Sequence, residues 1–285
     1  MEKLTRVKFS NLDKVLYPEL RLTKKDVIEH YIKVAPRMLP FLRERTLVRT
    51  RYPDGIGEEG FYEKDAPKGK PDWVETFTKY SKSSDKYTSY IVCNNLDTLL
   101  WLANLAALEM HTPLSKIPDT GKPDLILFDI DPEPPAGIRE AVQVALLVKE
   151  RLDEMGITSF VKTSGGKGLH VVANIELIYS FERTKDFVHE IGVRLARESE
   201  LIVSERSQTK EKGKVLIDYP QNSERATMIA PYSLRAVREA TVSTPLYWHE
   251  LAALNQYEHN IFNVSDRGDS PWSKLFEEPQ RLPNG

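Results

Sequence analysis

The clearest pattern of apolar and polar residues begins at residue 125. Residues 125–128 are four large apolar side chains, and the run continues into Asp129, Ile130, Asp131 and Pro132. Such a run predicts a buried strand, and the prolines that follow end it. Apolar residues then recur at helical spacing as far as Leu152, which predicts a helix that Gly156 can close.

A hairpin and a second helix follow. Residues 159–162 and 169–175 predict two strands joined by the glycine-rich turn 164–168, and a helix is expected from about residue 182 to 197. Residues 215–217 predict a last strand, which carries Asp218 at its end. The order strand, helix, strand, strand, helix, strand predicts a split βαβ (ferredoxin-like) unit, whose first strand lies between the third and the fourth.

This strand order predicts a candidate site. Asp129 and Asp131 are two residues apart, so both carboxylates project from one face of a strand, and Asp218 and His170 fall on its two neighbours. Because the aspartates lie late on antiparallel strands, a shifted pairing or a bulge is expected to bring them together. Paired carboxylates can hold the two divalent cations of phosphoryl transfer, although most isolated acidic pairs are solvated surface.

The turn at residues 164–168 has three glycines around Lys167. Such a turn lets backbone N–H groups approach an anion while Lys167 supplies positive charge. The simpler alternative is a flexible hairpin loop, and the spacing of a Walker loop is absent. His170 follows the turn, which favours a phosphate contact, although a lone histidine is more often packed in a core.

The remaining segments give less specific predictions. Residues 96–110 predict a buried helix, and the polar segments 78–88 and 204–214 predict exposed loops. We expect one domain over residues 1–285, made of an N-terminal α/β module (about 1–115), a catalytic module (about 120–240) and a C-terminal segment (about 241–285). The predicted fold class is α+β, with the N-terminal module packed against the antiparallel catalytic sheet.

Composition excludes several classes of protein. The single Cys93 rules out a disulfide framework and a multi-cysteine zinc site, and it suits a reducing cytosol. The first residues contain no apolar signal core, and the stretch 96–110 is too short and too often interrupted to cross a bilayer. We therefore expect a cytoplasmic protein and no membrane role; the resemblance described below adds that it is prokaryotic and associated with the nucleoid.

The net charge of −2 hides an asymmetry. Residues 1–90 contain 19 basic and 14 acidic residues, whereas the remainder contains 21 basic and 28 acidic residues. The basic third is therefore the candidate surface for a polyanion. It interleaves lysines and arginines with aromatic residues, as backbone contact and base stacking require, although such a mixture is more often a solvated face over a core: Lys14, Lys24, Lys25, Arg49, Arg51, Phe61, Tyr62, Lys64, Lys68, Lys70 and Trp73.

Together these motifs resemble the polymerase domain of the bacterial and archaeal end-joining ligase D proteins, in the archaeo-eukaryotic primase superfamily. The resemblance covers almost the whole chain and rests on five segments in the family's order. They are residues 10–18 (SNLDKVLYP), 108–113 (LEMHTP), 128–132 (FDIDP), 164–170 (SGGKGLH) and 217–236, which begins IDY and ends APYSLRA. This resemblance implies a primase-type catalytic core with an RRM-like sheet.

The resemblance also implies roles for individual residues. Asp129, Asp131 and Asp218 match the metal-binding triad, which holds two Mn²⁺ or Mg²⁺ ions. Residues that match contacts to the incoming nucleotide are His111, on its sugar side, and Ser164, Lys167, His170, Gln221 and Arg235. Residues that match DNA contacts are Lys14 and Lys24, at a 5′-phosphate, and Arg51, Phe61, Tyr62 and Lys64, at the template. Thr50 and Val237 depart from the pattern, since relatives often carry lysine and arginine there.

The implied function is metal-dependent, template-directed extension of DNA 3′ ends and gap filling in non-homologous end joining, with ribonucleotides preferred over deoxyribonucleotides. The implied partners are 5′-phosphorylated DNA ends or gaps, NTP or dNTP, Ku and an ATP-dependent DNA ligase. Met1 and the compact length favour a stand-alone polymerase whose partners are separate chains. Two alternatives stay open at this point: a primase that starts chains de novo, and a catalytically silent module that binds DNA ends.

Overall fold

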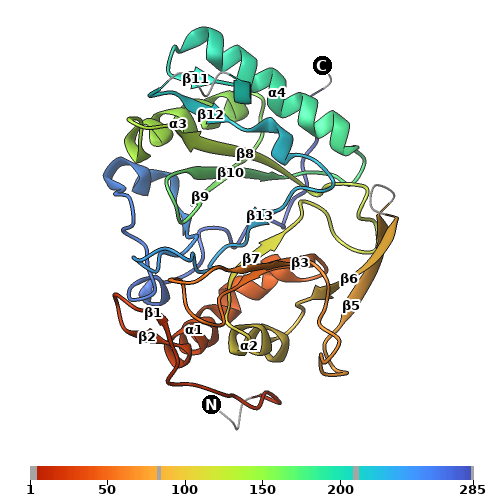
Figure 1. Cartoon of the computed structure of the whole chain (residues 1–285). Helices are drawn as coiled ribbons and strands as arrows, with labels where there is room; N and C mark the ends of the chain where they lie inside the picture. Colours follow the sequence, from red (N-terminus) through yellow and green to blue (C-terminus); the bar gives the residue numbers. More distant parts are fainter. Residues whose placement is uncertain (1–4, 82–84, 208–211, 284–285) are drawn as a thin grey trace. The chain divides into compact units, whose positions relative to one another are not determined.

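The computed structural model describes residues 5–81, 85–207 and 212–283 (Figure 1). The chain divides into two compact units, each described by itself. Unit 1 comprises Met1–Pro113, Ile229–Val242 and His259–Arg267, and unit 2 comprises Leu114–Met228, Ser243–Glu258 and Gly268–Gly285. Each unit is therefore made of three separate segments of the chain.

Unit 2 contains the expected split βαβ unit. Its strands are β8 (Leu125–Pro132), β9 (Phe160–Thr163), β10 (Leu169–Asn174), β11 (Ile202–Val203), β12 (Val215–Ile217) and β14 (Pro245–Leu246). Its helices are α3 (Ile138–Glu154), α4 (Phe181–Glu198) and the short 3₁₀ helices η2 (Tyr219–Gln221) and η3 (Trp248–Ala253). The sheet order β11-β12-β8-β10-β9-β14 confirms that β8 lies between β10 and β12.

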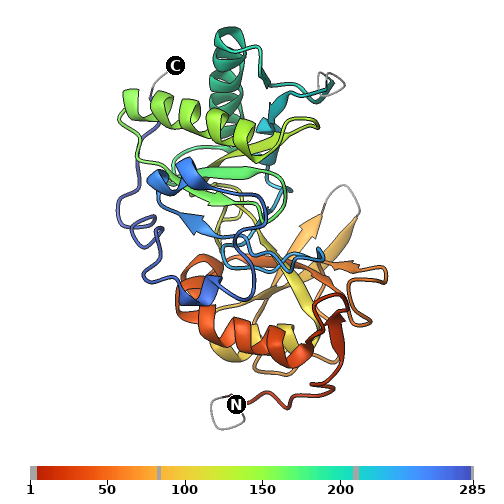
Figure 2. The same cartoon turned by 90° about the vertical axis from the view of Figure 1, so that its left-hand side faces the viewer.

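The core of unit 2 lies between this sheet and its two long helices. Figure 2 shows α3 and α4 on one face of the sheet. Alternate residues of β8, Ile126, Phe128 and Ile130, are fully buried against apolar residues of these helices. Because side chains alternate across a strand, Asp129 and Asp131 project from the opposite face.

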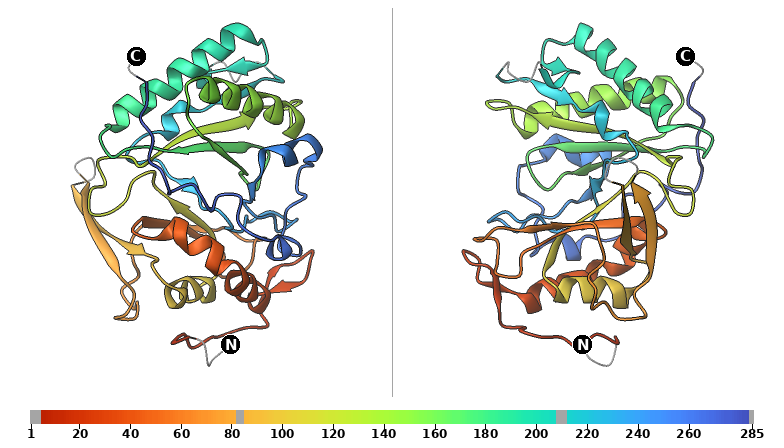
Figure 3. Two further views of the ribbon diagram at one scale, coloured as in Figure 1. Left: turned by 180° about the vertical axis from the view of Figure 1, so that it is seen from behind. Right: turned by 45° about the vertical axis from the view of Figure 1, so that its right-hand side comes forward.

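Unit 1 is built on a second antiparallel sheet. Its strands are β1 (Val15–Tyr17), β2 (Leu22–Thr23), β3 (Thr46–Arg51), β4 (Phe61–Glu63), β5 (Thr76–Ser81), β6 (Lys86–Val92), β7 (Ala107–Thr112) and β13 (Met228–Ile229). Its helices are α1 (Lys24–Leu42), α2 (Leu96–Asn104) and the 3₁₀ helix η4 (Val264–Asp266). The larger sheet has the order β13-β7-β3-β6-β5, with β4 paired to β3, and α1 and α2 lie side by side against it (Figure 3).

Two predictions in unit 1 were wrong. The helix expected over residues 96–110 ends at Asn104, because Ala106 turns the backbone to a positive φ of 57° and residues 107–112 continue as β7. Apolar content alone does not separate a buried helix from a buried strand. The loop expected over residues 78–88 is largely the β5–β6 ribbon, in which Tyr80 pairs with Tyr87. Residues 82–84 lie outside the described residues.

The segment expected as a loop over residues 204–214 precedes β12, and residues 208–211 of it lie outside the described residues. Among the described residues, no helix is both long and apolar enough to cross a membrane.

A buried asparagine completes the hydrogen bonding of β8 just before its aspartates. The Asn222 side chain accepts from the Leu127 N–H at 2.9 Å and donates to the Leu127 carbonyl at 2.7 Å, and Asn222 is fully buried. The side chain thus takes the place of a neighbouring strand where β12 has ended. Since both backbone groups of Leu127 are buried, they depend on this side chain.

We predict that Asn222→Ala lowers the free energy of unfolding by about 2–4 kcal/mol, because two buried backbone groups lose their partner. Urea denaturation followed by circular dichroism measures the change. Asn255→Ala, at an exposed position of the same unit, is the matched control and should change stability by less than about 0.5 kcal/mol. Equal effects of the two substitutions would contradict this role of Asn222.

Candidate active site

Three carboxylates meet on adjacent strands of unit 2. β12 pairs with β8 in a continuous antiparallel register, Val215 with Pro132, Leu216 with Asp131 and Ile217 with Ile130. The Asp218 N–H then donates to the Asp129 carbonyl at 2.8 Å. Asp218 therefore lies opposite Asp129 without any bulge, so the expected irregularity was wrong. The sheet itself brings Asp129, Asp131 and Asp218 to neighbouring positions.

Two basic residues and one aspartate form a row across the same sheet. Lys162 of β9 pairs with His170 of β10, which pairs with Asp129 of β8. His170 Nε2 lies 3.2 Å from Asp129 Oδ1, and the buried Lys162 ammonium donates to Ser243 Oγ at 2.6 Å. Burial raises the pKa of Asp129, but the charge and hydrogen bond of His170, with the charge of Lys162, outweigh burial and hold that pKa below its usual value.

The pKa of Asp131 is shifted in the opposite direction, above its usual value. Burial and the neighbouring charge of Asp129 raise its pKa, and Lys167 offsets only part of this effect. The ionised form of Asp131 is therefore destabilised by burial and by Asp129. A divalent cation bound to both carboxylates would offset this destabilisation. No three His, Cys, Asp or Glu side chains within the described residues are already close enough to enclose a metal ion.

Arg206 already binds Asp218. Its guanidinium binds both oxygens of Asp218, with Nε 2.9 Å from Oδ1 and a terminal nitrogen 2.5 Å from Oδ2, and Gln221 Nε2 donates to the same Oδ2 at 3.2 Å. A cation at Asp218 would compete with this fork. Arg206 was not predicted, because nothing in the polar segment 204–214 distinguishes one basic residue from the others.

The glycine turn is closed around Ser164. Ser164 Oγ accepts from the backbone N–H groups of Gly166 and Gly168, each at 3.2 Å, and the Ser164 N–H donates to the Gly168 carbonyl at 2.9 Å. Gly165 has a φ of 74°, a conformation that favours glycine. Lys167 Nζ lies 3.0 Å from Glu133 Oε1. An incoming phosphate would therefore replace Glu133 as the anionic partner of Lys167.

Gly168 packs directly on β8. A Cβ at this position would lie 2.3 Å from the Ile130 carbonyl oxygen and 3.2 Å from Asp131 Oδ1. Only a residue without a side chain allows this approach. The turn is thereby held beside Asp131.

The second set of predicted residues lies in unit 1. Thr50 of β3 pairs with Glu109 of β7 and with Tyr62 of β4, and Val48 pairs with His111. Paired residues share a face of the sheet, so Glu109, His111 and Tyr62 lie on one face. Leu108 and Met110, which alternate with them on β7, are fully buried.

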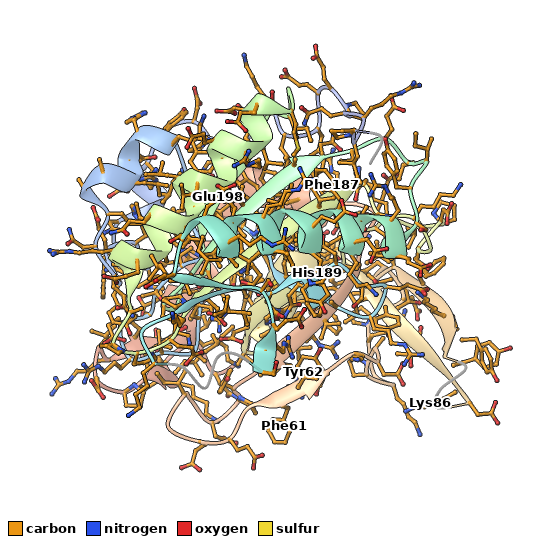
Figure 4. The ribbon with its side chains drawn as sticks, turned by 90° about the horizontal axis from the view of Figure 1, so that it is seen from above. Phe61, Tyr62, Lys86, Phe187, His189 and Glu198 are labelled. Carbon is orange, nitrogen blue, oxygen red and sulfur yellow. The ribbon has the colours of Figure 1, made fainter. Side chains whose placement is uncertain are left out.

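The aromatic pair of β4 is exposed. Phe61 and Tyr62, labelled in Figure 4, have 53% and 58% of their surfaces accessible, and the Lys64 ammonium lies 5.8 Å from the centre of the Tyr62 ring. Such rings can stack on bases. Arg51 binds Glu63 through two hydrogen bonds of 3.0 and 2.7 Å, and Arg49 lies 2.6 Å from the same carboxylate. The charge expected from Arg51 is therefore shared with Glu63.

Lys14 and Lys24 are neighbours in unit 1. The Lys24 N–H donates to the Lys14 carbonyl at 2.8 Å. Burial lowers the pKa of the Lys24 ammonium, and the charge of Lys14 lowers it further. Lys14 Nζ lies 2.6 Å from Asp54 Oδ1. An ammonium group that burial and a neighbouring charge destabilise suits an anion as a partner shared with that neighbour.

Comparison with known proteins defines the class. The family model of the LigD primase-polymerase domain matches residues 23–272. The structure is similar to that of the "Polymerase Domain from Mycobacterium tuberculosis Ligase D in complex with DNA", with a TM-score of 0.89 and 31% identity over 96% of this chain and 99% of that chain. The fold and site thus define a primase-type polymerase domain.

The curated relatives agree. The bifunctional non-homologous end joining protein LigD of Bacillus subtilis is 36% identical, over 98% of this chain and 45% of that protein. The multifunctional LigD of Mycolicibacterium smegmatis is 32% identical, over 94% of this chain and 35% of that protein. This chain belongs to the LigD primase-polymerase domain family, which implies nucleotidyltransferase activity. It spans less than half the length of these relatives.

We predict that Gly168→Ala lowers the free energy of unfolding by about 1–3 kcal/mol, because the new methyl group must push the turn away from β8. Chemical denaturation measures the change. Gly166→Ala is the matched control in the same turn, since a Cβ there would lie 3.6 Å from Ser164 Oγ, an ordinary contact. A Gly168→Ala protein as stable as Gly166→Ala would show that the turn is not held against Ile130.

Proposed function

We propose that this chain extends DNA 3′ ends by template-directed nucleotide addition at gaps and breaks that carry a 5′-phosphate, preferring ribonucleotides, within non-homologous end joining. The observation that carries the proposal is the group of Asp129, Asp131 and Asp218 beside the Ser164 turn. Carboxylates next to a glycine turn that carries a lysine suit metal-assisted nucleotidyl transfer. The names of the LigD relatives support the place in end joining.

The donor set fits Mg²⁺ or Mn²⁺, because hard divalent cations favour carboxylate oxygen. Asp129 and Asp131 would hold two ions, and Asp218 would complete the coordination of one. When bound, these ions would activate the 3′-hydroxyl and stabilise the charge on the leaving pyrophosphate. The raised pKa of Asp131 fits this role, since burial and the charge of Asp129 both disfavour its ionised form and a bound cation would favour it.

Other residues would bind the nucleotide and the DNA. In unit 2, Ser164, Lys167, His170 and Gln221 would contact the triphosphate and its surroundings. In unit 1, His111 and Arg235 would contact the nucleotide, and a terminal 5′-phosphate would bind Lys14 and Lys24. Phe61, Tyr62, Lys64 and Arg51 would contact the template by stacking and charge.

We further propose that Ku and an ATP-dependent DNA ligase act with this polymerase domain. Both names of the relatives describe end-joining proteins, and a filled gap still needs a ligase to seal the strand. Size-exclusion chromatography of the purified chain with each candidate partner and a DNA end tests this association.

We predict that Asp131→Ala lowers primer extension on gapped DNA by at least about a hundredfold, because the carboxylate stabilises the transition state, whereas affinity for DNA ends changes by less than about threefold. Primer extension with each nucleotide type in Mg²⁺ and in Mn²⁺, together with fluorescence anisotropy, measures both quantities. Asp119→Ala, at an exposed carboxylate of the same unit, is the control and should behave like the wild type.

Near-normal extension by Asp131→Ala in Mn²⁺ would overturn the metal assignment. Wild-type synthesis without a primer would favour the de novo primase. A wild-type protein that binds DNA ends but extends no primer with any nucleotide and metal would favour the silent end-binding module.

We predict that the wild type binds a 5′-phosphorylated gap about tenfold more tightly than the same gap ending in a hydroxyl, since two ammonium groups gain charge-assisted contacts. The double variant Lys14→Ala/Lys24→Ala should lose this preference and still extend a primer-template that has no downstream strand. The preference should shrink as salt rises. Anisotropy titrations at two salt concentrations measure it.

Lys25→Ala is the matched control, because Lys25 is an exposed lysine beside Lys24 that lies 3.8 Å from Glu29. It should keep the full preference. Equal affinity of the wild type for both gaps would remove the 5′-phosphate pocket from the proposal and leave a general primase-like polymerase.

A further inference from the structure

One carboxylate of unit 1 contacts both residues assigned to the nucleotide there. Glu109 Oε1 lies 3.0 Å from Arg235 Nε and accepts the Ala236 N–H at 3.1 Å. Glu109 Oε2 lies 3.5 Å from His111 Nε2. The Glu109 and His111 side chains are only 13% and 17% exposed, so this contact is shielded from water.

The two contacts of Oε1 fix the direction of Oε2. A carboxylate is planar, so once Oε1 is bound to the Arg235–Ala236 segment, Oε2 can point only toward a narrow range of positions. His111 lies in that range because it is two residues from Glu109 on β7 and projects from the same face. Burial raises the pKa of Glu109, but the hydrogen bond from His111 and the charge of Arg235 outweigh it and keep the carboxylate ionised.

We propose that Glu109 is a positioning residue that makes the site selective for ribose, by holding the proton of His111 on Nε2 so that Nδ1 accepts a hydrogen bond from the nucleotide's 2′-hydroxyl. This inference rests on the proposed function, in which His111 lies on the sugar side of the nucleotide. It adds the residue that sets the direction of the contact.

The chemistry of imidazole explains this selectivity. A neutral imidazole carries one proton on either of two nitrogens. A lone pair on Nε2 would face the Glu109 carboxylate and be repelled, so the proton resides there and Nδ1 becomes an acceptor. A ribose 2′-hydroxyl can donate to that acceptor, whereas deoxyribose leaves it unpaired, and an unpaired acceptor in a shielded site weakens binding.

The tautomer can be measured without any enzymatic activity. In the full chain labelled with ¹⁵N-histidine, long-range ¹H–¹⁵N spectra at neutral pH should show His111 protonated at Nε2 and unprotonated at Nδ1, assigned by comparison with His111→Ala. In Glu109→Ala the resonances should move toward a mixture of both tautomers. A His111 spectrum that is unchanged in Glu109→Ala, or a doubly protonated His111 in the wild type, would overturn the proposal.

Sugar selectivity gives the second test. The ratio of kcat/KM for a ribonucleotide to that for the matching deoxyribonucleotide, in single additions to gapped DNA, should fall about tenfold in Glu109→Ala, mainly through a higher KM for the ribonucleotide. His111→Ala should give the same fall, and the double variant should give no further one, because both changes remove one contact. Glu19→Ala, at an exposed acidic position of unit 1, should leave the ratio unchanged.

These measurements distinguish a failure of the role proposed for Glu109 from a failure of the proposed polymerase function. Equal losses for both sugars in Glu109→Ala, or additive effects in the double variant, would mean that Glu109 only supports the fold and would overturn this inference while leaving the polymerase assignment intact. A wild type that extends no primer would overturn the proposed function, whereas the tautomer measurement would still report whether Glu109 directs His111.

Discussion

The backbone hydrogen bond from Asp218 to Asp129 fixes the position of Asp218 beside the two aspartates of β8. It continues the antiparallel pairing of β12 with β8 by one residue beyond Ile217. Because the register of a sheet is fixed by the face that is buried, Ile126, Phe128 and Ile130 in the core oblige Asp129 and Asp131 to project from the other face. A slip of one residue would bury the aspartates and expose the isoleucines. The geometry of the site is thus a consequence of core packing.

This concentration of carboxylates is stable because basic side chains of the same unit lie close to it. His170 and Lys162 stand in one row with Asp129, Arg206 binds Asp218, and Lys167 contacts Glu133. Unit 1 repeats the arrangement with Arg51 on Glu63 and Arg235 on Glu109. Removing one member of a shielded pair is costly, so a ligand that takes one partner must replace its charge. In the proposed function, a metal ion would replace the charge of Arg206, and a phosphate would replace that of Glu133.

Sequence patterns predicted most of unit 2, because its signals are local. The alternation in residues 125–132, the glycine turn and the order of elements were enough to place β8 between β10 and β12 and to bring His170 and Asp218 beside it. The exact register was not predictable, since it depends on how far β12 extends before η2 begins. Arg206 was missed for a related reason: which basic side chain of a polar segment reaches Asp218 depends on the path of the backbone, which no residue pattern in that segment specifies.

Unit 1 was less predictable because only two residues separate its decisive strand, β7, from the end of the helix α2. Residues 96–110 are apolar enough to suggest one helix, and the turn at Ala106 leaves no mark in the composition. On a continued helix, Glu109 and His111 would point in directions about 200° apart, whereas on β7 they share a face. The distinction between helix and strand therefore decides whether Glu109 can act on His111 at all.

Each unit has a pair of functional side chains two residues apart on one strand, and the two pairs differ in their electrostatics. Asp129 and Asp131 are like charges two residues apart on a strand, so the charge of Asp129 adds to the effect of burial in raising the pKa of Asp131, and a bound cation would offset both effects. Glu109 and His111 have the same spacing, but an acceptor faces a donor, so the pair is complete within the chain and its effect is directional. The first arrangement can collect a ligand, and the second can only orient one of its own side chains toward a ligand. That difference follows from the residue types alone once the strand places both side chains on one face.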